Sequence, residues 1–147
     1  MARLKVSGFA EEVERFKQAG GDTQELIKAM LDAGIKVAKA EWKDVILKRR
    51  HLDTGDMRNS VDAAWVSYRN GAAEVYPLGT SRTGSVLRGN TKPRKPIRNA
   101  EKAFIIHYGR SNLAGDLFVD QVEEQVTDKG FDAMREVYDE FLEKEGL

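Results

Sequence analysis

The period of the apolar residues changes once along this chain of 147 residues, and that change limits the folds open to it. Over residues 23–49, apolar side chains recur every three or four positions, which predicts one long amphipathic helix. From Val61 onward, apolar and polar residues alternate with the two-residue period of a strand. The change falls at Asp53-Thr54-Gly55, so a helix is followed by strands and the chain is predicted to adopt an α+β fold.

Local signals divide the N-terminal part of the chain. Residues 1–21 are expected to form a short helix and a linker, with Gly20-Gly21 ending the helix. Asp22 and Glu25 form an Asp-x-x-Glu pair, which is typical of the start of a helix, so the long helix should begin directly after Asp22. Gly34 interrupts its apolar stripe and costs the helix roughly 1 kcal/mol relative to alanine. A close helix or sheet contact at that position would explain it.

Three strands are expected after the change of period. Asn70-Gly71 predicts a two-residue hairpin turn, because both residue types tolerate positive φ, and residues 72–76 return as the partner strand. Residues 103–108 are apolar enough to be the third, central strand. Helical spacing returns over 116–144 and predicts C-terminal helices, with Gly130 as the point where the pattern could divide in two.

A stretch of about 20 residues, 78–98, separates the second and third expected strands and is rich in Gly, Ser, Thr, Asn and Pro. A loop of that length is unusual in a compact domain, so it is expected to be either functional or mobile. The whole chain, 1–147, is therefore predicted to be a single domain. Its long N-terminal helix and its C-terminal helices would pack on a small antiparallel sheet, with this long loop between the second and third strands.

The charges of the chain are segregated, although 24 basic and 24 acidic residues give a net charge of zero. Between Glu74 and Glu101 there is no acid, and six basic residues give this loop a charge of +6. Residues 116–147 hold 11 acids and three bases, a charge of −8. Identical copies could therefore pack head to side through complementary surfaces. The six basic residues are Arg82, Arg88, Lys92, Arg94, Lys95 and Arg98.

No residue pattern predicts catalysis, cofactor binding or a metal site, so the chain is not expected to be an enzyme. The two histidines, His51 and His107, could join Asp53 at a metal, but the chain lacks cysteine and has no His-x-x-x-His spacing. They are interpreted as a helix-end residue and a strand residue. Asp53-Thr54-Gly55 also occurs in aspartic proteases, where it lies between apolar strands. Here it follows a helix and is interpreted as a structural joint with a permissive backbone at Gly55.

The basic loop is the segment with the clearest functional signal. It has no aromatic residue between Pro77 and Arg98, which disfavours stacking on single-stranded bases. Contact with a partner protein, contact with the phosphate backbone of duplex DNA, or no binding role all fit its composition. No secretory signal pattern is expected, and no run approaches the ~20 apolar residues that a membrane span needs.

Two ordered motifs resemble a known protein family. The first, Asp-Thr-Gly-x-hydrophobic-Arg-x-Ser-hydrophobic, contains the structural joint, and the second ends an apolar segment in Tyr-Gly-x-Ser. With the long helix before them and the acidic helix after them, they cover roughly residues 24–126 and resemble the tail-component family of long-tailed phages. These are small neck proteins described as tail terminators or head–tail joining proteins. The motif residues are Asp53, Thr54, Gly55, Arg58 and Ser60 in the joint and Tyr108, Gly109, Arg110 and Ser111 in the strand-end motif.

The chain departs from that family at two places. The family often has Glu-Phe-Gly-Thr where this chain has His107-Tyr108-Gly109-Arg110. It often has a proline-flanked segment before the last helix, and residues 114–119 contain no proline. These departures leave open which position in the neck the chain would occupy.

The resemblance implies a virion protein whose copies assemble into a ring, commonly a hexamer, that caps the tail tube. Its implied partners are other copies of itself, the tail tube protein, and the head connector, stopper or collar protein. DNA would pass through the lumen, where non-specific contact is a further option. The location implied is the tail or neck of a virion made in the bacterial cytoplasm, with no membrane and no cofactor. The alternative is a head-completion or connector protein that contacts packaged DNA through loop 78–98.

Overall fold

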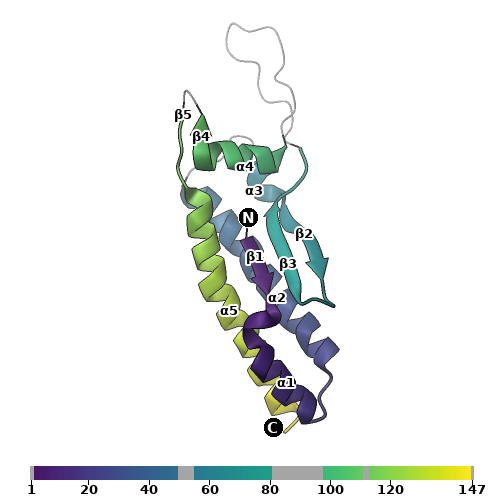
Figure 1. The fold of residues 1–147 in the computed structure, drawn as a ribbon. Helices are drawn as coiled ribbons and strands as arrows, with labels where there is room; N and C mark the ends of the chain where they lie inside the picture. The colour runs from purple at the N-terminus through teal and green to yellow at the C-terminus, as the bar shows by residue number, and fades with distance from the viewer. Residues whose placement is uncertain (1, 50–54, 81–97, 111–112, 147) are drawn as a thin grey trace, which may run out of the picture.

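A computed structural model describes residues 2–49, 55–80, 98–110 and 113–146 of the chain (Figure 1). It combines helices with a three-stranded antiparallel sheet, which confirms the α+β prediction. The described elements are β1 (Ala2–Lys5), the 3-10 helix η1 (Val6–Phe9), α1 (Ala10–Gln18), α2 (Thr23–Lys48), α3 (Asp56–Asn59), β2 (Val61–Ser67), β3 (Ala72–Pro77), α4 (Asn99–Tyr108), β4 (Gly109–Arg110), β5 (Leu113–Ala114) and α5 (Phe118–Lys144).

The long N-terminal helix begins and ends close to where the sequence predicts. The Asp22 carboxylate accepts hydrogen bonds from the backbone N–H groups of Gln24 and Glu25, at 3.1 and 3.2 Å. These bonds satisfy two of the donors that a helix N-terminus leaves without an intrahelical partner. The predicted N-cap is therefore confirmed, and α2 runs without a break to Lys48.

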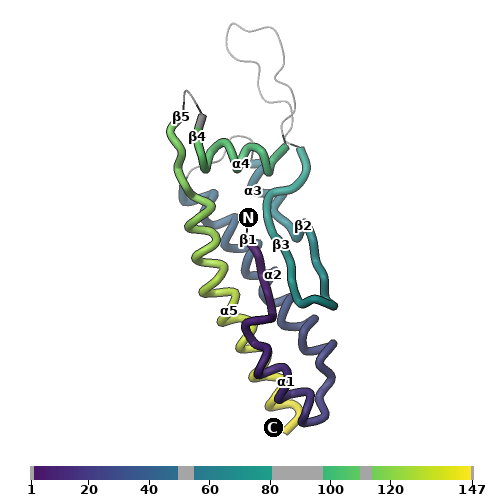
Figure 2. Tube along the Cα trace, in the orientation of Figure 1, coloured from purple at the N-terminus to yellow at the C-terminus, as the bar shows by residue number. Residues whose placement is uncertain are grey.

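The two long helices, α2 and α5, lie side by side along the length of the domain (Figures 1 and 2). The predicted division of the C-terminal segment at Gly130 does not occur, because α5 is a single helix. Gly130 instead allows a close contact with the sheet, since a Cβ there would lie 3.2 Å from the Leu4 side chain. A Cβ on Gly34 would lie 3.4 Å from the same leucine and 2.4 Å from Met134. Gly34 therefore has the close contact that the sequence called for.

The sheet has the strand order β1-β3-β2, and all its pairs are antiparallel. The prediction of a short helix and a linker over residues 1–21 is wrong for residues 2–5, which form β1. In β1, Ala2 and Leu4 are buried while Arg3 and Lys5 are exposed. A strand of four residues is too short for this alternation to stand out in a sequence.

The hairpin between β2 and β3 differs in detail from the predicted two-residue turn. Its loop covers residues 68–71, and of the two predicted turn residues only Gly71 has positive φ, at 63°. The Gly71 carbonyl accepts a hydrogen bond of 2.7 Å from the Val6 N–H, which connects the hairpin to the end of β1. A β-bulge between Ala63 and Trp65 shifts the register and leaves the Trp65 side chain 48% exposed.

The predicted third strand at 103–108 is wrong, because these residues form most of α4. Ala103 and His107 are buried and Ile106 is partly buried, so the inward residues follow helical spacing. A short apolar run fits a buried strand and a buried helix equally well, and here the helix formed. The long loop therefore connects β3 with α4 and not with a further strand of the sheet.

Trp42 of α2 lies at the centre of the core. Its indole N–H donates a hydrogen bond of 2.7 Å to the Val75 carbonyl of β3, and its ring meets Phe118 of α5 edge to face, with 6.0 Å between centroids. The buried Trp42 side chain therefore connects α2 with α5 and with the middle strand of the sheet.

We predict that Trp42→Phe lowers the free energy of unfolding by about 1–3 kcal/mol, because it removes a buried hydrogen bond and leaves a smaller ring. Urea unfolding measures the loss. Trp65→Phe is the matched control: its side chain is half exposed, so a change within about 0.5 kcal/mol is expected. Equal losses in the two variants would contradict the central role of Trp42.

Candidate protein-interaction site

The described part of the predicted structural joint is a turn that leads into a short helix. Gly55 has φ of 84°, in the left-handed region, and directly precedes α3. The Ser60 hydroxyl donates to the Met57 carbonyl at 2.9 Å and closes the last turn before β2. The Nε of Arg58 is buried and has no hydrogen-bond partner among the described residues. His51, Asp53 and Thr54 lie outside the described residues.

The two motifs that resemble the family lie at the same end of the domain, where α3 of the first motif packs against α4, the helix that leads into the second (Figure 1). The Ser60 carbonyl accepts a hydrogen bond from the Leu78 N–H at 3.0 Å. The Leu78 and Gly79 carbonyls in turn accept bonds from the Asn99 side chain, at 2.8 Å, and from the Asn99 N–H, at 2.9 Å. Asn99 is only 2% exposed. No local pattern in the sequence marks this residue, because its role depends on a contact with the start of a distant loop.

Two aromatic side chains stand on the outer face of α4. Phe104 is 57% exposed and Tyr108 is 63% exposed, and their ring centroids lie 4.7 Å apart. One helical turn separates them, so they form one continuous surface, which we call the aromatic pair. Large aromatic side chains gathered on a surface mark sites where proteins contact one another.

The aromatic pair forms one side of a groove between α4 and α5, with a cavity volume of about 210 Å³. Two acids of α5 form the other side, and the Asp120 side chain is 68% exposed. Sites for small molecules or cofactors usually have volumes of 300 Å³ or more, so this groove suits a single long side chain. The residues of the α4–α5 groove are Phe104, His107, Tyr108, Val119, Asp120 and Glu123.

His107 lies at the base of the groove and has a structural role. Its Nδ1 accepts a hydrogen bond of 3.2 Å from the Val119 N–H, and its Nε2 lies 3.8 Å from an Asp120 carboxylate oxygen. The N-cap of α5 is Leu117, which has φ of 55° and no side-chain cap of its own. His107 therefore satisfies a free donor at the start of α5 from a neighbouring helix. It is a helical residue, so its predicted place in a strand is wrong.

The described residues of the strand-end motif end α4 and begin the ribbon that precedes α5. Gly109 has φ of 81° and lets the chain leave α4 for the two-stranded ribbon of β4 and β5, in which Gly109 pairs with Ala114 and Arg110 with Leu113. Gly115 then passes so close to α4 that a Cβ there would lie 2.6 Å from the His107 carbonyl oxygen. Ser111 lies outside the described residues.

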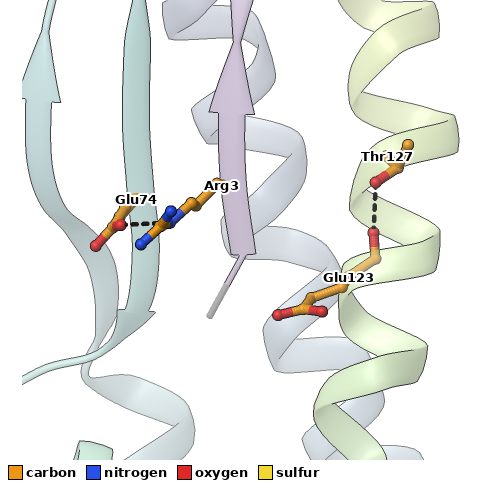
Figure 3. Close-up of a pocket in the computed structure, with 4 residues that line it drawn as sticks. All are labelled: Arg3, Glu74, Glu123 and Thr127. Atoms are coloured by element: carbon orange, nitrogen blue, oxygen red, sulfur yellow. Dashed lines mark hydrogen bonds and ion pairs between the residues drawn. The ribbon is translucent and has the colours of Figure 1, made fainter.

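A larger cleft, of about 510 Å³, lies between β1 and α5 (Figure 3). Arg3 points along the sheet toward Glu74, and an ion pair of 2.6 Å joins them. Thr127 donates a hydrogen bond of 2.8 Å to the Glu123 carbonyl within the same helix. The ion pair therefore lies within the sheet, and the hydrogen bond lies within α5.

Two polar contacts hold the hairpin of β2 and β3 against α2. The Tyr68 hydroxyl donates a hydrogen bond of 2.7 Å to Asp32, and this bond raises the pKa of Tyr68 above its ordinary value. The Asp62 carboxylate accepts a bond of 2.8 Å from the Ala63 N–H and lies 3.3 Å from the Lys39 ammonium. The Ala63 bond, and then Lys39, lower the pKa of Asp62.

The described residues include the acidic helix α5 but only the two ends of the basic loop. Arg98 is exposed at the start of α4 and forms a bridge with Thr80, so the two ends of the basic loop meet there. Most acids of α5 are exposed, and Asp116, just before α5, pairs with Arg49, the residue after α2, at 3.0 Å. The remaining predicted loop residues lie outside the described residues; they are Arg82, Arg88, Lys92, Arg94 and Lys95.

Comparisons with protein-family models, with curated proteins and with solved structures found no match for this chain. None of the helices in the described residues is long and apolar enough to cross a membrane. Within the same residues, no group of three or more His, Cys, Asp or Glu side chains is placed to hold a metal ion.

We predict that Gly55→Val lowers the free energy of unfolding by about 1–3 kcal/mol, because a β-branched residue is strained at positive φ. Gly55→Asn is the control, since asparagine tolerates the left-handed region better, and it should lose less than half as much. Thermal and urea unfolding measure both losses. A melting temperature of Gly55→Val equal to that of the wild type would show that the joint imposes no such constraint.

The Asp62 carboxylate should contribute stability that depends on pH. Since its pKa is lower in the folded chain, this contribution is present above its ordinary pKa and is lost as the pH falls through the folded value. Asp62→Asn removes it. The difference in melting temperature between wild type and variant should therefore be largest near pH 6 and shrink toward about pH 2. A difference that stays constant over this range would contradict the assignment.

Proposed function

We propose that this chain is a structural protein of the phage neck. Its copies would form an oligomeric ring, commonly a hexamer in the family that its motifs resemble. The ring would cap the tail tube and join it to the head connector, stopper or collar protein, with DNA passing through the lumen. Its place would be the virion, after synthesis in the bacterial cytoplasm.

The observation that carries this proposal is that the two motifs lie at the same end of the domain and are connected through α4. Residues of the first motif contact the start of the long loop, and that loop contacts the first residue of α4, which ends in the second motif. The described motif residues supply turns, caps and packing, as Gly55, Ser60 and Gly109 illustrate. This is what a scaffold for assembly requires, and the exposed aromatic pair lies at the same end.

A ring also requires two different surfaces on each copy, because each subunit contacts its neighbours through unlike faces. This chain offers a basic loop and an acidic helix, and within its described residues β1 and β2 are the two edges of the sheet. Unlike charges favour the head-to-side contact and disfavour a contact between two identical faces.

The first test is the mass and symmetry of the purified chain, alone and with the tail tube protein of the same phage. Native mass spectrometry and negative-stain electron microscopy should show one closed ring, either alone or at the end of tail tubes. A chain that stays monomeric in both settings would overturn the proposal. Duplex DNA binding by such a monomer, with a steep salt dependence, would favour the alternative head-completion role.

We predict that reversing three basic loop residues, Arg94→Glu, Lys95→Glu and Arg98→Glu, weakens ring assembly and leaves the melting temperature of the monomer unchanged. The loop charge falls from +6 to zero, so the attraction to an acidic neighbour is lost. The same number of reversals at exposed sites of α1 and α2 is the control, and these should assemble normally. The control substitutions are Arg15→Glu, Lys17→Glu and Lys36→Glu. Heads joined normally to tails by the loop variant would rule out the loop as an assembly contact.

A further inference from the structure

We propose that the α4–α5 groove binds arginine side chains from the basic loop of a second copy of this chain. The part of the loop concerned is residues 80–98, from one end of the Thr80–Arg98 bridge to the other, and is called the segment below. The inference rests on the proposed function, because it names the contact through which one subunit of the ring would hold the next. The proposed function does not say which surfaces of neighbouring subunits meet. This inference names the α4–α5 groove on one subunit and the basic segment on the next.

The groove has the two chemical features that an arginine side chain requires. The aromatic pair offers exposed ring faces, over which a planar guanidinium group stacks favourably. On the opposite side, the exposed Asp120 side chain carries a carboxylate that can accept paired hydrogen bonds from the same group, and Glu123 adds a second negative charge. A lysine has the charge but neither the planar shape nor the fork of donors, so arginine is the better fit.

The segment has matching chemistry. It holds six basic residues and no acid, and four of the six are arginines. The groove and the rest of α5 carry the opposite sign, since residues 116–147 have a charge of −8. This charge complementarity selects the segment as the occupant. Its arginines are Arg82, Arg88, Arg94 and Arg98.

The positions of the segment and the groove on one copy are compatible with contact between copies. The segment begins and ends at the bridge between Thr80 and Arg98, beside the first turn of α4. The groove lies at the last turns of the same helix, which is about 15 Å long at ten residues. Donor and acceptor at opposite ends of one element are suited to a repeating head-to-side contact, in which each copy gives its segment to one neighbour and receives that of the other.

The first arm of the test reverses the groove charges with Asp120→Lys and Glu123→Lys. Sedimentation velocity should show association at least about tenfold weaker than for the wild type. Glu136→Lys with Asp139→Lys is the control, because it makes the same charge change at the same spacing on exposed positions of the same helix. The control should associate as the wild type does. Equal weakening in both would attribute the effect to net charge and overturn the assignment of the groove.

A second variant tests the groove without a change of charge. Phe104→Ala with Tyr108→Ala removes the aromatic pair, and both side chains are exposed, so the monomer should keep its melting temperature. This variant should also associate at least about tenfold more weakly. Unchanged association would show that the aromatic pair does not bind the segment, even if the groove reversal had failed to fold.

The decisive arm mixes two variants that should each be monomeric. One carries the groove reversal, and the other carries Arg82→Glu, Arg88→Glu and Arg94→Glu in the segment. In an equimolar mixture the unchanged segment of the first variant meets the unchanged groove of the second, so native mass spectrometry should show a one-to-one complex of the two variants. A mixture that stays monomeric overturns the inference.

These outcomes separate this inference from the proposed function. A wild-type chain that forms no ring overturns both. A wild-type ring whose affinity is unchanged by the groove reversal and by loss of the aromatic pair overturns only the groove as the binding site for the segment.

Discussion

The close approach of β1 to both long helices is the constraint on which the rest of the domain depends. Leu4 packs where α2 and α5 each carry a glycine, and a Cβ on Gly34 or Gly130 would crowd it. With β1 held there, β3 pairs with it and presents the Val75 carbonyl to Trp42. Pairing of β2 with β3 then completes the hairpin. Two glycines that lower the intrinsic stability of their helices therefore allow the sheet to pack on them.

The groove at the other end of the domain is built by the same kind of close contact. Gly115 passes against the backbone at the end of α4, and His107 caps the start of α5. These two contacts fix the separation between the helices, so Asp120 lies opposite the aromatic pair. His107, which the sequence offered only as a weak candidate metal ligand, thus helps to determine the shape of a surface, and exposed residues beside it give that surface its chemistry.

Local signals were sufficient for the parts of the fold that local interactions determine. The Asp22 cap, the length of α2 and the pairing of β2 with β3 follow from residues close together in sequence. Elements decided by distant contacts could not be predicted in this way. Residues 103–108 became a helix because of what they pack against, and Asn99 was recognisable only once Leu78 lay beside it. The exposed aromatic pair was missed for the same reason, since a strand would have placed Phe104 and Tyr108 on a buried element.

The segregated charge bears on how copies of this chain would associate. A two-fold symmetric contact centred on the basic loop alone, or on the acidic helix alone, would bring like charges together. A head-to-side contact brings unlike surfaces together, and a rotation that closes on itself turns that contact into a ring. Under the proposed function, arginines held by a neighbour's acids are already neutralised. The contact that closes the ring would therefore also lower the affinity of these arginines for DNA phosphates. The duplex could then pass through the lumen.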